Sequence, residues 1–375
     1  MKIIADDKIP FLKGALEPFA EVIYIPGNQI RREIIMDADA LLIRTRTKCN
    51  GDLLEGTSVR FIGTATIGFD HIDTNYCIKN KIFWTNAPGC NSSSVQQYIA
   101  AALSRISSNT GYRLKGKTLG IVGVGNVGSK VGNFARSIGM SVLLNDPPRA
   151  RQEGNQNFHS LETVLTESDI VTVHVPLNMV GRDVTYHLFN EERFKKLNKK
   201  ALFINSSRGE VMDTEALKKF LYSGKIGGAV LDVWENEPDI DLELMQKVLI
   251  ATPHIAGYSA DGKANGTAMV VNSLNKYFSL SDRNWYPENI PLPASTEISI
   301  DCRDKTIEEL VIEAVIHTYN IDEDSARLRR SPSDFEKLRG DYPLRREFSS
   351  YSVKLINGSE EFQKVLKAIG FNIVD

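Results

Sequence analysis

The stretch that decides the fold is LGIVGVGNVG, which runs from Leu119 to Gly128 and contains the pattern Gly-x-Gly-x-x-Gly. Its first four residues are apolar or glycine, as in a strand that is buried on both faces. Apolar residues then recur at helical spacing as far as Ile138, and an apolar run from Val142 to Leu144 favours a second strand. The sequence therefore predicts a βαβ unit whose first turn is rich in glycine.

The three glycines have different expected roles in that turn. Gly123 allows the tight turn, Gly125 lets the backbone approach a pyrophosphate, and Gly128 lets helix and strand pack closely. The helix N-terminus offers N–H groups and the positive end of its dipole to phosphates. We therefore predict a dinucleotide site whose turn residues are Gly123, Gly125, Asn126, Val127 and Gly128. The alternative is a glycine turn that serves packing only.

The expected second strand leads to Asp146, which comes 18 residues after Gly128. A carboxylate at that point can accept hydrogen bonds from both ribose hydroxyls of NAD, and it repels the 2′-phosphate of NADP. Arg149 and Arg151 follow closely, and these two cations keep NADP open as an alternative. We predict NAD as the cofactor.

Bulk composition argues against several classes of protein. The chain has 375 residues, of which 42% are hydrophobic and 25% charged, and its net charge of -2 implies no basic face for nucleic acid. It begins directly with an expected strand and has no apolar run of about 18 residues, so we expect a cytoplasmic protein without leader or membrane span. The four cysteines lack Cys-x-x-Cys spacing, and we expect no metal site.

The order of expected elements divides the chain into three regions. Residues 1–92 alternate short apolar runs with amphipathic segments, which is typical of a parallel sheet covered by helices. The dinucleotide unit and further strands follow, and a helix from Tyr258 to Phe278 returns the chain to the first region. We predict an α/β protein with two Rossmann-like, doubly wound parallel-sheet domains and a small α+β C-terminal domain. The expected bounds are 1–92 with 259–285 for a discontinuous substrate-binding domain, 93–258 for the NAD domain with a bridging helix, and 286–375 for the tail.

Three residues of the NAD domain, Arg208, Glu237 and His254, match the chemistry of hydride removal from a hydroxy acid. Each follows an expected strand of one sheet, so all three should reach the edge that carries the glycine turn. A base must take the hydroxyl proton, a carboxylate must orient that base, and a cation must hold the substrate carboxylate. We predict His254 as the base, Glu237 as its partner and Arg208 as the carboxylate ligand.

The motifs around these residues resemble the D-isomer-specific 2-hydroxyacid dehydrogenases. The resemblance extends to about residue 280 and rests most firmly on NSSRGEVMD from Asn205, AVLDVWENEP from Ala229 and TPHIA from Thr252. It implies an NAD-dependent dehydrogenase with a catalytic Arg, Glu and His. It also implies that the cofactor contacts Asp146, Val175, Ser206, Ser207, Arg208, Asp232 and Gly257. Val175 stands where the family often has Thr, so a hydroxyl bond there is lost and only a backbone contact could survive.

Further motifs resemble one branch of that family: RTRT from Arg44, GTATIGFDHID from Gly63, and the C-terminal extension. They imply a small phosphorylated 2-hydroxy acid as substrate and a homodimer that forms through the C-terminal domain. By the same resemblance, the residues that contact substrate are Thr45, Thr66 and Tyr258.

A substrate phosphate needs cations, and the sequence offers two pairs. Arg44 and Arg46 are the first candidates because they follow an expected strand of the outer domain, and Arg345 and Arg346 of the tail are the second. Two other functions stay open. A related dehydrogenase of 3-phosphoglycerate or glycerate would use the same Arg, Glu and His, whereas an NAD-responsive binding protein would keep the fold without turnover.

Overall fold

The computed structural model describes residues 1–374, which divide into two compact units. Within the described residues, the first unit comprises Met1–Asn91 and Ser259–Pro291, and the second comprises residues 92–258 and 292–374. The first unit is discontinuous in sequence. The contacts of the C-terminal segment, which we define as residues 292–374, join it to the residues of the expected NAD domain.

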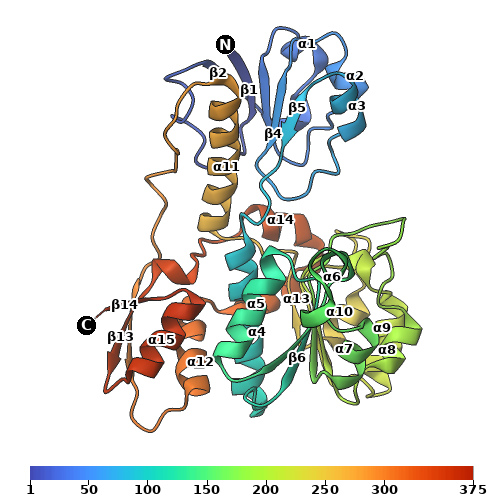
Figure 1. Ribbon diagram of the computed structural model, residues 1–375, viewed down its shortest axis with the longest axis vertical. Coiled ribbons are helices and arrows are strands. Elements are labelled where there is room, and N and C mark those ends of the chain that lie inside the picture. The colour runs from blue at the N-terminus through green and yellow to red at the C-terminus, as the bar shows by residue number, and fades with distance from the viewer. Residues whose placement is uncertain (375) are drawn as a thin grey trace. The chain divides into compact units, whose positions relative to one another are not determined.

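A five-stranded parallel sheet forms the first unit, with the order β2-β1-β3-β4-β5. Its strands are β1 (Lys2–Asp6), β2 (Glu21–Ile25), β3 (Ala40–Ile43), β4 (Phe61–Thr64) and β5 (Phe83–Thr85). Short helices α1 (Arg32–Ile35), α2 (Gly51–Leu54) and α3 (Thr74–Lys79) cover one face, and α11 (Ala260–Phe278) covers the other (Figure 1). The apolar runs of the strands are therefore buried on both faces, as expected for parallel sheets.

A six-stranded parallel sheet forms the centre of the second unit, with the order β11-β10-β9-β8-β6-β7. Its strands are β6 (Thr118–Val122), β7 (Ser141–Asn145), β8 (Ile170–Val173), β9 (Leu202–Asn205), β10 (Gly228–Leu231) and β11 (Ile250–Ala251). The order reverses between β6 and β8, and ligands of such sheets bind in the crevice at that reversal. The loop after β6 is the glycine turn.

Helices cover both faces of this sheet, and the alternating side chains of its strands enter two separate apolar cores. The helices before the C-terminal segment are α4 (Ser92–Thr110), α5 (Asn126–Ser137), α6 (Pro147–Glu153), α7 (Leu161–Glu167), α8 (Glu191–Lys196), α9 (Thr214–Tyr222) and α10 (Leu242–Lys247). The side chains of Asp146, Ser160, Asn190, Asp213 and Asp241 cap five of them. Single turns of 3-10 helix lie at Gly27–Gln29, Asn155–Asn157, Gly209–Val211, Pro332–Asp334 and Phe348–Ser350.

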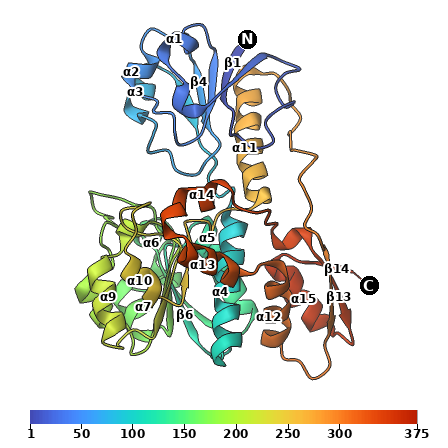
Figure 2. The ribbon, with the colours of Figure 1, turned by 180° about the vertical axis from the view of Figure 1, so that it is seen from behind.

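The C-terminal segment contains a three-stranded parallel sheet and four helices within the described residues. Its elements are β12 (Glu297–Asp301), α12 (Ile307–Thr318), α13 (Ile321–Arg330), α14 (Phe335–Gly340), β13 (Ser352–Ile356), α15 (Glu360–Ile369) and β14 (Asn372–Val374). Helix α12 lies beside α4, as Figures 1 and 2 both show, and α15 packs against α5. Buried apolar residues of this segment pack against those of α4 and α5 within the chain.

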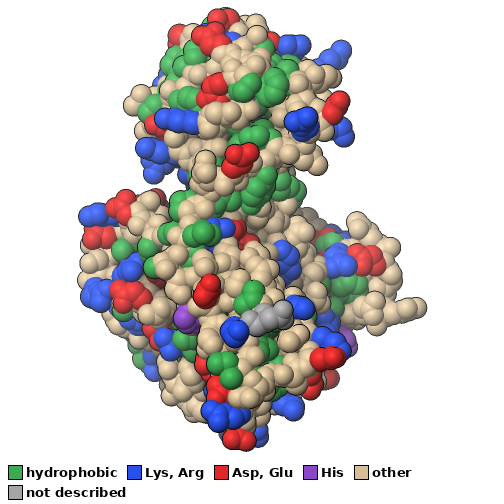
Figure 3. Space-filling model, turned by 90° about the vertical axis from the view of Figure 1, so that its left-hand side faces the viewer, with side chains coloured by type: hydrophobic (Ala, Val, Ile, Leu, Met, Phe, Trp, Pro, Cys, Tyr) green, Lys and Arg blue, Asp and Glu red, His purple; other side chains and the backbone are tan. Residues whose placement is uncertain are grey.

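These observations confirm the α/β fold class with Rossmann-like parallel sheets. Lys and Arg side chains lie among Asp and Glu side chains on the face drawn in Figure 3, in keeping with the near-neutral net charge. Within residues 1–374, every helix is too short or too polar to span a lipid bilayer.

Candidate active site

The glycine turn between β6 and α5 is tight on one side and open on the other. Gly123 has a φ of 92°, and a Cβ there would come closer than 3.0 Å to the His174 carbonyl. A Cβ at Gly128 would overlap the Gly123 carbonyl oxygen, so the helix can approach the turn only without a side chain. A Cβ at Gly125 would meet nothing within 4 Å. The backbone at Gly125 is thus left open in the way that a pyrophosphate requires.

Two alanine substitutions are expected to separate cofactor binding from folding. Gly128→Ala should lower Tm by several degrees, because its Cβ cannot fit beside the Gly123 carbonyl and overpacking typically costs about 1–3 kcal/mol. Gly125→Ala should leave Tm unchanged without cofactor but weaken NADH binding at least about tenfold, since its methyl group takes the space of a phosphate. Thermal melts and NADH fluorescence titrations measure both effects. Unchanged NADH affinity in Gly125→Ala would remove Gly125 from the cofactor site.

Asp146 lies beside this turn and has both carboxylate oxygens engaged with backbone. Oδ1 accepts from the N–H of Arg149 at 3.0 Å, and Oδ2 accepts from the N–H of Val124 at 2.9 Å. A carboxylate oxygen has lone pairs for a second donor, so ribose hydroxyls can still be accepted.

The two arginines that kept NADP open both have acidic partners. Nε and Nη2 of Arg149 donate to the Glu153 carboxylate at 2.6 and 2.7 Å, and Arg151 pairs with Asp183. Because their charges are already compensated, they are poorly suited to a 2′-phosphate. The geometry favours NAD.

The loop after β9 contains a buried hydroxyl that suits a ligand. Ser206 Oγ is buried and has no hydrogen-bond partner among residues 1–374. Its neighbour Ser207 is engaged, because its Oγ donates to Asn205 Oδ1 at 2.8 Å. Val175, after β8, is half-buried, and its side chain lies against Gly123. The unpartnered serine and the open face of Gly125 together fit a dinucleotide.

His254 and Glu237 form a bonded pair. His254 Nδ1 and Glu237 Oε2 are 2.7 Å apart, and the other oxygen of Glu237 accepts from the N–H of Trp234 at 2.9 Å. The carboxylate is thereby fixed at both oxygens, and it fixes the orientation of the imidazole. The His254 side chain is 30% exposed. Its Nε2 is the ring nitrogen that remains for a substrate proton.

Arg208 reaches the same place because of the glycine that follows it. A Cβ at Gly209 would overlap the backbone of Trp234 and Glu235, so only glycine lets the Arg208 turn touch the turn that carries Glu237. The guanidinium donates one bond, from Nη1 to the Ser207 carbonyl, at 2.8 Å. A hollow of about 270 Å³ is lined by Tyr186, Arg208, Gly209, Glu210, Trp234, Glu235, Asn236, Glu237 and His254. The structure therefore brings the three expected catalytic residues to one hollow in the second unit.

Asp232 is buried and binds backbone N–H groups of the loop that carries His254. Its carboxylate accepts from the N–H groups of Ile255 and Ala256, both at 2.8 Å, and from the Thr252 hydroxyl at 2.6 Å. Burial raises the pKa of Asp232 above the ordinary carboxyl value, although these bonds oppose that change. Asp232 is predicted from the sequence as a cofactor contact, and the structure adds a second role in shaping the loop after β11.

The expected substrate contacts of the first unit lie after β3 and β4. Thr66 Oγ1 lies 2.7 Å from Thr64 Oγ1 and 3.0 Å from the Gly68 carbonyl, and Arg44 donates to the Lys8 carbonyl at 3.0 Å. Thr45 and Arg46 are exposed. All of these expected substrate contacts belong to the first unit, whereas Arg208, Glu237 and His254 belong to the second.

The remaining substrate candidates lie in the second unit. Tyr258 and Gly257 follow the His254 turn and are half-buried, and Arg346 is 7% exposed. Arg345, a second-choice phosphate ligand in the sequence analysis, is 5% exposed and donates to the backbone carbonyls of Ile255 and Ala256.

The sequence does not predict that Arg339 lies near Tyr258, one of the expected substrate contacts. Its guanidinium lies 5.9 Å from the centroid of the Tyr258 ring. It comes from α14, a polar helix of six residues without apolar periodicity that would reveal it.

Comparison with known families agrees with this site. The model described as the NAD binding domain of the D-isomer specific 2-hydroxyacid dehydrogenases matches residues 90–256, and a domain of unknown function matches residues 290–370. Fold, site and family match define an NAD-dependent 2-hydroxyacid dehydrogenase.

A Bacteroides thetaiotaomicron protein named erythronate-4-phosphate dehydrogenase is 53% identical over 94% of this chain and 99% of its own length. A Proteus mirabilis protein of the same name is 43% identical over 99% of both chains. The chain therefore belongs to the erythronate-4-phosphate dehydrogenase family within the D-isomer-specific 2-hydroxyacid dehydrogenases.

Solved structures share the fold over about three quarters of the chain. The Aquifex aeolicus D-lactate dehydrogenase complexed with NAD and lactic acid is 27% identical, with a TM-score of 0.60 over 74% of this chain and 96% of its own. The NAD-bound 3-phosphoglycerate dehydrogenase of Entamoeba histolytica is 25% identical, with a TM-score of 0.62 over 77% and 98%. The NAD complexes of these relatives support NAD as the cofactor of this chain.

Proposed function

We propose that this protein oxidises 4-phospho-D-erythronate to 2-oxo-3-hydroxy-4-phosphobutanoate with NAD, as a step of pyridoxal phosphate biosynthesis. The observation that carries the proposal is the hollow that joins Arg208, Glu237 and His254 in a chain whose full-length relatives are named for this substrate. We also propose that it acts in the cytoplasm as a homodimer that forms through the C-terminal segment, as its resemblance to the family implies.

The reaction follows from three side chains. NAD, when bound, accepts the hydride that leaves C2 of the substrate. Arg208 holds the C1 carboxylate, and His254 takes the C2 hydroxyl proton at Nε2. Glu237, bonded to Nδ1 at 2.7 Å, keeps the imidazole oriented and stabilises the imidazolium that forms.

The residues that we propose for the cofactor surround the carboxyl ends of β6 to β11. Those residues are Gly123, Gly125, Asn126, Val127, Gly128, Asp146, Val175, Ser206, Ser207, Arg208, Asp232 and Gly257. The open face of Gly125 and the unpartnered Ser206 hydroxyl are the observations that support this set.

The substrate phosphate needs at least one cation, and Arg44, Arg46 and Arg346 are our candidates, alongside Thr45, Thr66 and Tyr258 as contacts. We expect that replacing the phosphate-binding arginine with methionine raises KM for 4-phospho-D-erythronate about tenfold or more, because a charge-assisted bond is lost. The KM for the unphosphorylated acid, D-erythronate, should not change. Steady-state kinetics with both acids measures this difference. If all three variants keep the wild-type KM, other residues hold the phosphate.

The function is tested by NADH formation at 340 nm with purified protein, NAD and a set of acids. The proposal expects a strong preference for 4-phospho-D-erythronate over 3-phosphoglycerate, glycerate and lactate. A preference for 3-phosphoglycerate, whose NAD-bound dehydrogenase shares this fold, would keep the mechanism and overturn the substrate. NADH binding without oxidation of any acid would instead indicate a binding protein that lacks turnover.

A further inference from the structure

A buried arginine of the C-terminal segment contacts the loop that carries His254. We call residues 252–256 the His254 loop. Nη2 of Arg345 donates to the carbonyl oxygens of Ile255 and Ala256, at 3.2 and 2.6 Å. These are the two residues that follow His254 directly, although Arg345 lies 90 and 89 positions further along the chain.

The same two residues are also held through their N–H groups, by Asp232. Its carboxylate accepts from the N–H groups of Ile255 and Ala256, and the backbone carbonyl of Asp232 accepts from the N–H of His254 at 2.7 Å. The His254 loop is therefore fixed by two buried side chains. The Asp232 carboxylate accepts hydrogen bonds from its N–H groups, and the Arg345 guanidinium donates hydrogen bonds to its carbonyl groups. Such a restraint has a purpose here, because His254 has a φ of 55° that a residue with a side chain rarely adopts.

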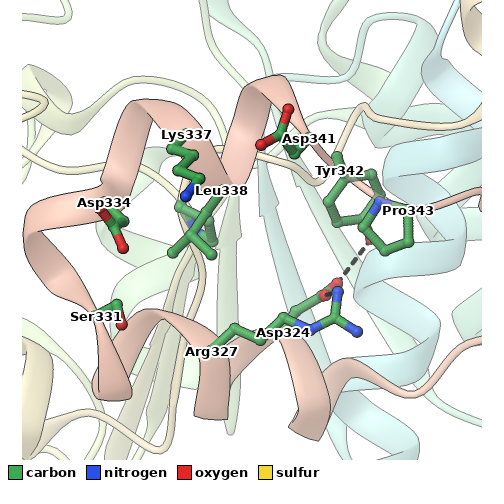
Figure 4. Close-up of a pocket in the computed structure, with 10 residues that line it drawn as sticks. Asp324, Arg327, Ser331, Asp334, Lys337, Leu338, Asp341, Tyr342 and Pro343 are labelled. Carbon is green, nitrogen blue, oxygen red and sulfur yellow. Dashed lines mark hydrogen bonds and ion pairs between the residues drawn. The ribbon is translucent and has the colours of Figure 1, made fainter.

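Aromatic side chains of the C-terminal segment hold the guanidinium of Arg345 in place. Its Cζ lies 4.6 Å from the centroid of the Tyr319 ring and 5.7 Å from that of Tyr342. Both tyrosine hydroxyls donate to Asp324 of α13, at 2.8 and 2.7 Å, and Figure 4 shows the bond between Tyr342 and Asp324. Nε and Nη1 of Arg345 have no hydrogen-bond partner within residues 1–374. The hydrogen bonds of this side chain are therefore directed at the His254 loop.

We propose that Arg345 is a positioning residue that sets His254 for proton transfer. This gives the C-terminal segment, which a domain of unknown function matches, a part in catalysis within the same chain. The proposal rests on the proposed role of His254 as the base. A displacement of about 1 Å at a reacting group can cost on the order of 10²-fold in rate. Loss of the Arg345 bonds should therefore lower kcat more than NADH affinity, because most of the proposed cofactor residues belong to the loops after β6, β7, β8 and β9.

Arg329 supplies a matched control. It also belongs to the C-terminal segment and donates to two backbone carbonyls of the second unit, those of Met245 and Val248, at 2.7 and 2.8 Å. Those carbonyls lie outside the His254 loop. A merely structural role for such arginines predicts the same outcome for both substitutions, whereas a positioning role predicts different ones.

The experiment compares the full-length variants Arg345→Met, Arg345→Lys and Arg329→Met with the wild type. We expect Arg345→Met to lower kcat roughly 10- to 100-fold with NADH affinity and KM for NAD within about threefold of wild type. Arg345→Lys keeps the charge and one donor, so it should recover part of kcat. Arg329→Met should melt at a lower temperature but keep kcat within about twofold.

Two results would overturn the proposal: wild-type kcat in Arg345→Met, or equal losses of kcat in Arg345→Met and Arg329→Met. If Arg345→Met does not fold, Arg345→Lys is compared with Arg329→Met in its place. Hydrogen exchange of a peptide covering the His254 loop separates this proposal from the proposed function. Should the wild type oxidise no acid, faster exchange at Ile255 and Ala256 in the Arg345 variant alone still supports the restraint, and equal exchange in all variants refutes it.

Discussion

Replacing His254 with asparagine is expected to lower kcat by about 10²–10⁴-fold with little change in NADH affinity, the loss that removal of a general base typically causes. Asparagine tolerates the positive φ of this position better than most residues, so the loop should keep its shape. Its amide can still bond Glu237 but cannot take a proton from the substrate hydroxyl. Stopped-flow measurement of NADH formation gives kcat, and NADH fluorescence gives the affinity.

The chain offers a close control in His187. Its Nε2 lies 2.7 Å from Glu235 Oε1, and its φ of 46° is also positive, so His187→Asn removes a carboxylate-bonded imidazole of the same backbone conformation. We expect kcat of His187→Asn to stay within a few-fold of wild type. Near-normal turnover in His254→Asn, or a collapse only in His187→Asn, would show that the base has been misassigned.

Gly209→Ala is expected to lower kcat/KM for the acid more than about 100-fold. Its Cβ would overlap backbone atoms of Trp234 and Glu235, which no side-chain rotation can relieve, so the turn with Arg208 must move away from the turn with Glu237. Overpacking of this kind costs about 1–3 kcal/mol of stability or more, and the misplaced cation no longer holds the substrate carboxylate. Thermal melts and steady-state kinetics measure the two effects.

Gly340→Ala is the control for that substitution, because it adds the same methyl group in the same unit where a Cβ meets nothing within 4 Å. It should leave both Tm and kcat/KM close to wild type. If Gly209→Ala behaves like Gly340→Ala, the close contact between the two turns does not shape the site.

Much of the fold follows from local patterns. The strands of the two large sheets are short apolar runs that end next to glycine or polar residues, and the glycine turn has few other structural uses. Because parallel strands present their carboxyl ends at one edge, the sequence alone predicts that Arg208, Glu237 and His254 lie close together. The number of residues between them in the sequence does not by itself indicate that they lie close together.

The contacts of the C-terminal segment could not be predicted in the same way. Helix α13 reads IDEDSARLRR and has few apolar positions from which a helical period could be recognised, and α14 has six residues. The bonds from Arg345 to Ile255 and Ala256 join residues far apart in the chain, and no local pattern reports such a contact. From the sequence, an arginine near the C-terminus suggests a phosphate ligand, whereas the burial of Arg345 against Tyr319 is a tertiary contact that the sequence does not report.

The most direct test of the account follows the hydride itself. The protein is incubated with NAD and 4-phospho-D-erythronate that carries deuterium at C2, and the mass of the NADH formed is measured. Our account predicts NADH one mass unit heavier than the unlabelled cofactor, because the hydride comes from C2. Unlabelled NADH, or none from this acid while another hydroxy acid is oxidised, would contradict it.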